Sequence, residues 1–246
     1  MTGNSESLRA WLLHSRPFRD TSLLLDFLTL ENGRVSAIAR GVRNSKSRGR
    51  SILQPFIPLQ ITVMGKHDLQ TLRSFEPAAS SIHLLAGERL FAGFYLNELL
   101  VKLLSAHDAE PDLFHMYEQT IQGLAQGLDL EPLLRCFELQ LLETLGYGIP
   151  FDHDSESGAE IEPEYWYFLQ AESGFVKQLQ LPPNDGSRER AGLFAGKELQ
   201  NINDRNFTAA ATRRVAKRLL RDLLQRHLGG REISSRALFR QRSAEA

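Results

Sequence analysis

Cysteine is almost absent from this chain of 246 residues, which carries only Cys136. A single thiol excludes an internal disulfide and any zinc site built from several cysteines. No apolar run approaches the ~20 residues that a membrane-spanning helix needs. The N-terminal segment MTGNSESLRA also lacks the basic and then apolar plan of a signal peptide. We therefore expect a cytosolic protein.

Acidic residues are absent from one long stretch, between Asn32 and His67. Within it, residues 40–50 hold five cations, although the whole chain has 29 Lys and Arg against 30 Asp and Glu. Residues 1–80 carry 11 cations and 6 anions, residues 81–204 carry 7 and 21, and residues 205–246 carry 11 and 3. Two basic ends flank an acidic middle, which indicates a polyanionic partner.

The first 80 residues have the pattern of short strands. Apolar or alternating segments are separated by turn residues, and Glu31-Asn32-Gly33 is a good hairpin signal. The predicted strands cover residues 8–14, 21–30, 33–40, 55–65 and 69–76. Five strands in so short a segment favour a small closed barrel, because an open sheet of this size would leave its edges exposed.

Beyond Pro77 the apolar spacing becomes helical, which predicts helices over residues 82–107, 110–126, 130–148 and 207–230. Residues 151–190 interrupt this pattern with an acidic, turn-rich segment and then a small β-hairpin, and helices resume near Leu193. The predicted fold class is α+β, with an N-terminal five-stranded OB-type β-barrel followed by an α-helical domain that carries the hairpin insertion. The predicted domains are 1–80, 81–150, 151–190 and 191–246.

No convincing catalytic motif emerges. GLFAGKE (192–198) is similar to a phosphate-binding loop, but its first glycine is one residue too close and Glu198 stands where Ser or Thr would bind magnesium. Cys136 has an apolar flank typical of a buried thiol. A further set of residues straddles a helix break and is better explained as a solvated boundary than as a metal site: His107, Asp108, Asp112 and His115. We expect a protein that is not an enzyme.

The basic stretch favours nucleic-acid binding. An OB-type barrel binds single strands with a positive groove and aromatic side chains on which bases stack. The aromatic candidates are Trp11, Phe18 and Phe56, each of which could equally lie in the core. A solvated loop that serves solubility is the alternative. The predicted phosphate contacts in this region are Arg34, Arg40, Arg43, Lys46, Arg48, Arg50, Lys66 and Arg73.

A second basic surface is predicted on the last helix. Val215, Leu219 and Leu223 share one face, and the helical period places four cations on the opposite face. Such a ridge could follow phosphates or receive an acidic peptide, and the alternative is an ordinary charged exterior. The four cations are Arg214, Lys217, Arg218 and Arg221.

The order and spacing of several motifs resemble the RecO family of DNA-repair mediators, nearly from end to end. The motifs are LLHSRPFRDTSLLLDFLT, RVSAIARGVRNSKS, LQPFIPLQITVMG, TLRSFEP, FYLNELL, RCFELQLLETLGYG and LGGREISSRALFRQ. The resemblance implies an N-terminal OB-fold, a helical domain and a small insertion.

The same resemblance implies a non-enzymatic role at the bacterial nucleoid, on single- and double-stranded DNA. Such proteins anneal complementary strands and, with RecR, help load RecA onto DNA coated by single-stranded DNA-binding protein. Two alternatives stay open on the residues alone: a protein-interaction adaptor whose acidic middle is the main surface, and an RNA-binding OB-fold protein.

The insertion departs from many members of that family, which carry a four-cysteine zinc site shortly after the position of Phe151-Asp152. This chain has HDSESG (153–158) there and no cysteine, and carboxylates and hydroxyls do not reproduce a thiolate zinc site. We expect no metal and no other cofactor. The hairpin must then be held by packing of aromatic side chains, namely Tyr165, Trp166, Tyr167, Phe168 and Phe175.

A receptor for the acidic C-terminal tail of single-stranded DNA-binding protein needs an apolar pocket with a guanidinium at its rim. Arg135 is predicted to supply the guanidinium, with Arg218 and Arg221 as second contacts. The alternative is that Arg135 pairs with Glu131 or Glu138 on the helix surface. The apolar residues predicted beside Arg135 are Leu134, Leu139 and Leu142.

Overall fold

The structure, a computed structural model, describes residues 5–43, 49–65, 68–78, 84–170, 173–183, 186–235 and 237–238. The chain forms two compact units, the first comprising residues 1–130 and 227–246 and the second residues 131–226. The boundaries of these units differ from those of the four predicted domains, and the domain boundaries stay a prediction.

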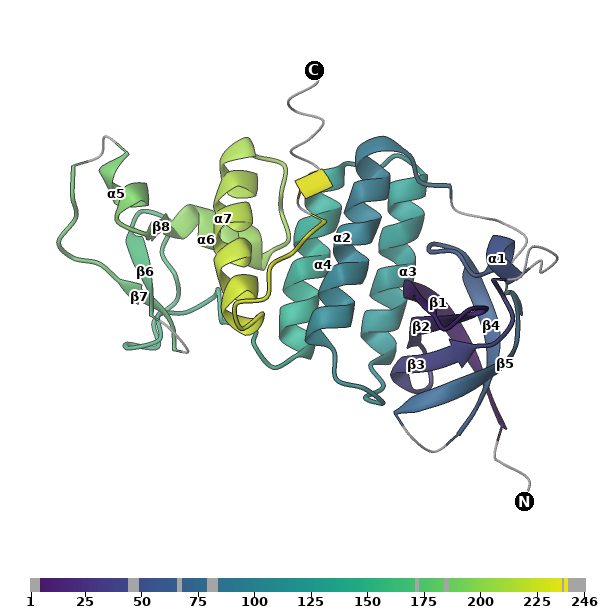
Figure 1. Cartoon of the computed structure of the whole chain (residues 1–246). Helices are drawn as coiled ribbons and strands as arrows, with labels where there is room; N and C mark the ends of the chain where they lie inside the picture. Colours follow the sequence, from purple (N-terminus) through teal and green to yellow (C-terminus); the bar gives the residue numbers. More distant parts are fainter. Residues whose placement is uncertain are drawn as a thin grey trace. The chain divides into compact units, whose positions relative to one another are not determined.

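Five strands of the first unit form a closed barrel in the order β1-β2-β3-β5-β4 (Figure 1). Only β3 and β5 pair in parallel, and every other pair is antiparallel. The strands are β1 (Ser5–Phe18), β2 (Ser22–Thr29), β3 (Gly33–Ala39), β4 (Pro58–Met64) and β5 (Leu69–Pro77), and the short helix α1 (Gly49–Ile52) lies between β3 and β4. The predicted five-stranded barrel is thus confirmed, although β1 runs well beyond residue 14, where the sequence placed its end.

Alternation along each strand fills the barrel. On β3 the buried Val35, Ala37 and Ala39 alternate with Ser36 and Ile38, which stay partly exposed. Burying one such aliphatic side chain contributes about 1.5–3 kcal/mol. The barrel core also takes in residues of the other strands and of the β3–β4 connection, among them Leu8, Leu12, Leu25, Phe27, Leu53, Ile57, Leu59, Ile61, Val63 and Leu72.

The predicted Glu31-Asn32-Gly33 hairpin is confirmed between β2 and β3. Gly33 has φ +60°, and a Cβ at this position would lie 1.8 Å from the carbonyl oxygen of Asp108. The Thr29 hydroxyl donates to the Gly33 carbonyl oxygen at 2.8 Å. Only glycine fits both this conformation and this close approach, so the hairpin docks tightly on the 104–110 connection of the same unit.

Two helices of the first unit, α2 (Gly87–Leu103) and α3 (Pro111–Ala125), lie side by side next to the barrel (Figure 1). The buried Asn97 of α2 donates to the carbonyl oxygen of Leu13 at 3.0 Å and accepts from the Tyr117 hydroxyl at 2.6 Å. The ring of Tyr117 meets Trp11 edge-on, with centroids 5.7 Å apart. Burial raises the pKa of Tyr117, so its hydroxyl stays protonated and keeps donating to Asn97.

Near its C-terminus the chain returns to α2. The Glu98 carboxylate accepts hydrogen bonds from the backbone N–H groups of Ser234 and Ser235 at 2.9 and 2.8 Å. Lys102 lies 2.6 Å from the same carboxylate and also donates to the carbonyl oxygen of Glu232. One partly buried acid therefore ties the C-terminal segment to α2.

The second unit combines helices with a small sheet of order β7-β6-β8 (Figure 1). The predicted hairpin is confirmed as β6 (Trp166–Gln170) and β7 (Gly174–Lys177). A third strand, β8, forms where a helix was expected to resume, at Leu193. The other elements are α4 (Leu130–Thr144), α5 (Ser187–Arg190), β8 (Leu193–Ala195), α6 (Gly196–Asn203) and α7 (Ala210–His227).

Aromatic packing holds the insertion only in part. Tyr167 and Phe175 are buried, and Phe175 packs against Phe151 and Phe194 at 5.4 and 5.8 Å. The prediction is wrong for Phe168, which is exposed because alternation along β6 turns it away from the packed face. Tyr165 precedes β6 and is exposed as well, although Lys177 Nζ of β7 lies 3.2 Å from the centroid of its ring.

None of the helices within the described ranges is long and apolar enough to cross a membrane.

Candidate functional site

The outward face of the barrel gathers residues from four strands in one row. Arg16 of β1 pairs with Leu24, Leu24 with Ile38, and Ile38 with Thr71 of β5. Because Leu25, Ala37 and Leu72 point into the core, their neighbours in this row point outward. Arg40 is exposed two residues beyond Ile38 and therefore continues the same face.

Arg73 joins this face through a β-bulge. Thr62 pairs with Ser74 and Val63 with Leu72, which leaves Arg73 as the extra residue on β5. Its guanidinium is exposed and lies 3.4 Å from the sulfur of Met64. The parallel register pairs Ile38 with Thr71, and Arg40 and Arg73 each follow two residues later, so both lie towards the same end of the barrel.

Two further cations are Arg19 in the β1–β2 turn and Arg43 in the connection that follows β3. The backbone N–H of Arg43 donates to the Thr21 carbonyl oxygen at 3.0 Å, and its guanidinium donates to the Arg19 carbonyl oxygen at 3.0 Å. The Arg19 guanidinium lies over the Phe18 ring, 5.3 Å from its centroid. Asp20, an exposed acid, lies in the β1–β2 turn as well. We name the set Arg16, Arg19, Arg40, Arg43 and Arg73 the cationic face.

The other predicted phosphate contacts are either engaged with neighbouring groups or lie outside the described residues. Arg34 donates from Nε to the Leu104 carbonyl oxygen at 3.0 Å, and its Nη1 lies 3.6 Å from the Asp26 carboxylate, so it is already engaged. Lys46, Arg48 and Lys66 fall outside the described residues, as does the side chain of Arg50. Arg16 and Arg19 were missed: the sequence ended the first strand at residue 14, so it did not show that Arg16 pairs with β2.

A carboxylate marks one limit of the cationic face. Asp26 lies on the outward side of β2, where it accepts a hydrogen bond from Ser36 Oγ at 2.5 Å and faces His14 and Arg34 at 3.7 and 3.6 Å. Burial acts to raise the pKa of Asp26, but hydrogen bonds from His14 and Ser36 and the Arg34 guanidinium outweigh it and lower that pKa. The charge of Asp26 is thus kept and locally compensated.

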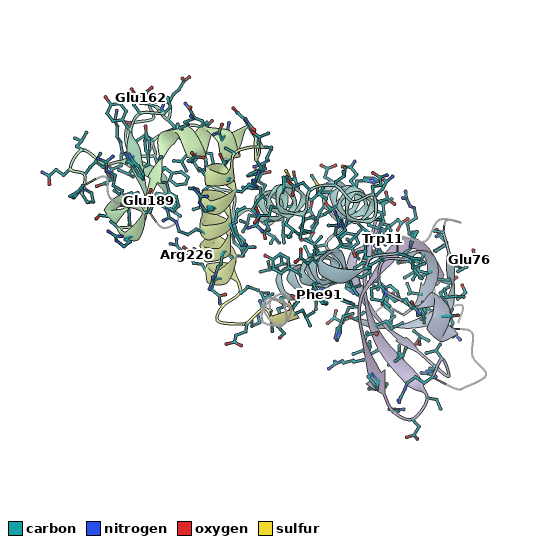
Figure 2. All side chains as sticks on the ribbon, turned by 90° about the horizontal axis from the view of Figure 1, so that it is seen from above. Trp11, Glu76, Phe91, Glu162, Glu189 and Arg226 are labelled. Atoms are coloured by element: carbon teal, nitrogen blue, oxygen red, sulfur yellow. The ribbon has the colours of Figure 1, made fainter. Side chains whose placement is uncertain are left out.

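The three aromatic candidates differ in burial. Trp11 and Phe56 are buried, Trp11 between the barrel and the helices of the first unit (Figure 2) and Phe56 against Phe94 of α2. Phe18 is partly exposed and, two residues beyond Arg16, shares its side of β1. Phe18 is therefore the aromatic side chain that lies on the cationic face.

On α7 the predicted ridge is only partly open. Arg214, Lys217 and Arg221 are exposed, as predicted, and Lys217 Nζ lies 3.6 Å from Glu131. Arg218 instead donates to the carbonyl oxygens of Glu189 and Leu193, both at 2.8 Å, and stacks on the Phe194 ring at 4.5 Å. Arg218 therefore ties α7 to β8 and α5, while the roles of the ridge in DNA and tail binding stay predictions.

The predicted tail receptor on α4 is closed in the structure. Arg135 Nη2 lies 2.9 Å from Glu138 Oε1, and the two side chains are 9% and 2% exposed. The alternative of a pair with Glu138 is confirmed, but the pair is buried and not at the helix surface. The predicted apolar wall is buried too, at Leu134, Leu139 and Leu142. A tail carboxylate would have to compete with Glu138, and the tail-binding role stays a prediction.

The sequence matches two family descriptions that together cover nearly the whole chain. Residues 1–81 match Recombination protein O N terminal, and residues 84–237 match Recombination protein O C terminal. The chain belongs to the RecO family. It is similar to the DNA repair protein RecO of Methylococcus capsulatus, at 43% identity over 95% of this chain and 93% of the relative. It is 44% identical to the DNA repair protein RecO of Pseudomonas paraeruginosa, over 94% of this chain and 94% of the relative. It is 40% identical to that of Haemophilus influenzae, over 96% of this chain and 97% of the relative.

The insertion of this RecO-family chain, in which no zinc site was predicted, is organised around the Asp154 carboxylate. Asp154 is buried and its carboxylate accepts hydrogen bonds from the backbone N–H groups of Glu156, Ser157 and Lys177 at 3.0, 2.7 and 2.6 Å, and from the Ser157 hydroxyl. Burial acts to raise the pKa of Asp154, and these hydrogen bonds lower it. The carboxylate thus organises the loop itself. Across the described part of the chain, no three His, Cys, Asp or Glu side chains are placed to hold a metal ion.

Cys136 is the one thiol of the chain. Cys136 is partly buried, and burial raises its pKa despite the nearby charge of Arg205. A raised pKa lowers the thiolate fraction at neutral pH, so Cys136 lacks the activation that a nucleophilic cysteine needs.

Proposed function

We propose that this protein is a DNA-binding recombination mediator in DNA repair. The observation that carries the proposal is the cationic face: five arginines and the partly exposed Phe18 on the outward side of an OB-type barrel. Guanidinium groups bind phosphates, and an aromatic ring accepts a stacked base. Membership of the RecO family supports the same role, since its relatives are DNA repair proteins by name.

The proposal extends to the individual steps. The protein would bind single- and double-stranded DNA and anneal complementary strands without a catalytic centre. With RecR it would help load RecA onto DNA coated by single-stranded DNA-binding protein, whose C-terminal tail it would contact. Work on chromosomal DNA would place it at the nucleoid in the bacterial cytoplasm. The half-buried Leu24 and Ile38 between the arginines support the single-strand part, because unpaired bases present apolar surfaces that a duplex hides.

The decisive experiment removes charge from the cationic face. We expect Arg16→Gln combined with Arg40→Gln to weaken binding to a single-stranded oligonucleotide at low salt. The plot of log affinity against log salt should lose ~0.7 of slope for each phosphate contact removed, about 1.4 in total. The same variant should anneal complementary strands more slowly, both when the strands are naked and when they are coated by single-stranded DNA-binding protein.

Arg9→Gln is the matched control. Arg9 is an exposed arginine on the same strand, but its guanidinium lies 3.4 Å from Glu118 and 5.5 Å from the Phe114 ring centroid of α3, away from the cationic face. It should leave the salt slope unchanged. An unchanged slope in the double variant would move the DNA site to Arg214 and Arg221. Stronger binding to RNA than to DNA of the same sequence would favour the RNA-binding alternative.

A further inference from the structure

One end of the barrel carries a cavity of about 410 Å³ that the DNA-binding role does not use. Its wall comes from β1, from the β2–β3 hairpin, from the ends of β4 and β5, and from the connection between α2 and α3. The lining residues are Glu6, Glu31, Asn32, Gly65, Gln70, His107 and Ala109. All of them belong to the first unit.

The wall offers hydrogen-bond acceptors and negative charge. Glu31 accepts from the backbone N–H of Arg9 at 3.0 Å, and Glu6 accepts from the Asn32 amide at 2.7 Å. Each carboxylate has lone pairs beyond these bonds. No lysine or arginine of the described ranges lines the cavity. Among the described residues of the wall, no lysine or arginine therefore matches the charges of Glu6 and Glu31.

Gln70 provides an independent sign of a ligand. Its side chain is only 7% exposed, and its Oε1 accepts no hydrogen bond within the described part of the chain. A buried amide oxygen without a donor costs about 1–3 kcal/mol. An acceptor that shares the cavity wall with two carboxylates suits a ligand group that carries several hydrogen-bond donors and no acceptor.

We infer that this cavity binds a guanidinium or alkylammonium group. A guanidinium has five N–H donors and an ammonium three, and neither has an acceptor. Such a group would donate to Gln70 Oε1 and to the two carboxylates together. The chemistry is shared by two sources, the arginine or lysine side chain of a protein partner and a free polyamine.

The experiment is an amide NMR titration of the full-length protein with three probes. N-acetyl-L-arginine methylamide represents a side chain, spermidine represents a polyamine, and N-acetyl-L-glutamine methylamide is the neutral control. We expect saturable shifts at Asn32, Gly65, Gln70 and His107 with one or both cationic probes, and none with the neutral probe. Tighter binding of the arginine probe assigns the site to a protein partner, and tighter binding of spermidine assigns it to polyamines.

Two variants make the test specific. Glu6→Gln combined with Glu31→Gln should weaken binding at least tenfold, and Gln70→Met severalfold, with melting temperatures measured to show that both fold. Glu76→Gln is the control, because Glu76 lies at the opposite end of β5, paired with Gln60, on the side of the barrel away from the helices (Figure 2). Shifts scattered over other acidic residues, equal shifts with the neutral probe, or an equal loss in Glu76→Gln would overturn the assignment.

Discussion

Replacing Glu98 with glutamine should release the C-terminal segment from α2 and destabilise the first unit. The Glu98 carboxylate accepts two backbone hydrogen bonds, from Ser234 and Ser235, and forms an ion pair with Lys102 at 2.6 Å. Burial acts to raise the pKa of Glu98, but Lys102 and the donors of Ser234 and Ser235 outweigh it and lower that pKa to about 2. An amide of the same shape has one acceptor oxygen and no charge, so one backbone N–H loses its partner.

The expected magnitude follows from these contacts. A pKa change from 4.5 to about 2 corresponds to at most ~3.4 kcal/mol, at 1.36 kcal/mol per pKa unit. The side chain is 17% exposed, so solvent reduces this value and we expect a loss of about 2 kcal/mol. For a chain of this size, the melting temperature should fall by roughly 4–8 °C.

The pH dependence gives the sharper test. The pKa is lowered in the folded protein, so the stabilisation is fully present above pH 4.5 and is lost as the pH falls towards 2. Urea unfolding of the natural protein and of Glu98→Gln should therefore differ most at pH 7 and progressively less at pH 4 and pH 3. Glu88→Gln, on the first turn of the same helix, should cost less than about 1 kcal/mol. A difference that stays constant from pH 7 to pH 3 would refute the reasoning.

Three further predictions concern the second unit. Asp154→Asn should lower its stability by about 2–3 kcal/mol, measured by urea unfolding, because the loop loses charge-assisted hydrogen bonds. The purified protein should contain no stoichiometric zinc by elemental analysis, and a chelator should leave the melting temperature and annealing unchanged; a chelator-induced loss of folding would contradict this. Arg135→Ala should cost about 3–5 kcal/mol by leaving Glu138 charged and buried, whereas Arg135→Leu with Glu138→Leu should recover most of it. That double variant should weaken binding of the acidic tail peptide severalfold, measured by fluorescence anisotropy, while sparing annealing of naked strands.

Periodic patterns were enough to predict most of the fold. Alternation with period two determined the five strands, and helical spacing determined α2, α3, α4 and α7, because both depend on neighbours within one segment. The hairpin at Gly33 followed from the same local chemistry. The strand β8 was missed, since only three residues form it and its pairing partners lie far away in the sequence.

Less of the candidate site could be predicted from periodic patterns. The sequence by itself determined that cations concentrate near residues 40–50 and that one thiol excludes a cysteine zinc site. Only the tertiary structure decided which cations are available: the pairing of β1, β2, β3 and β5 placed Arg16, Arg40 and Arg73 on one outward face of the barrel. The same folding engaged Arg34 with a carbonyl oxygen 70 residues away, and buried Arg135 against Glu138. The physical reason is that composition gives the type of a side chain, and periodicity gives the face of the strand or helix on which it lies. The partners of that side chain depend on strand register and on contacts between segments that are distant in the sequence.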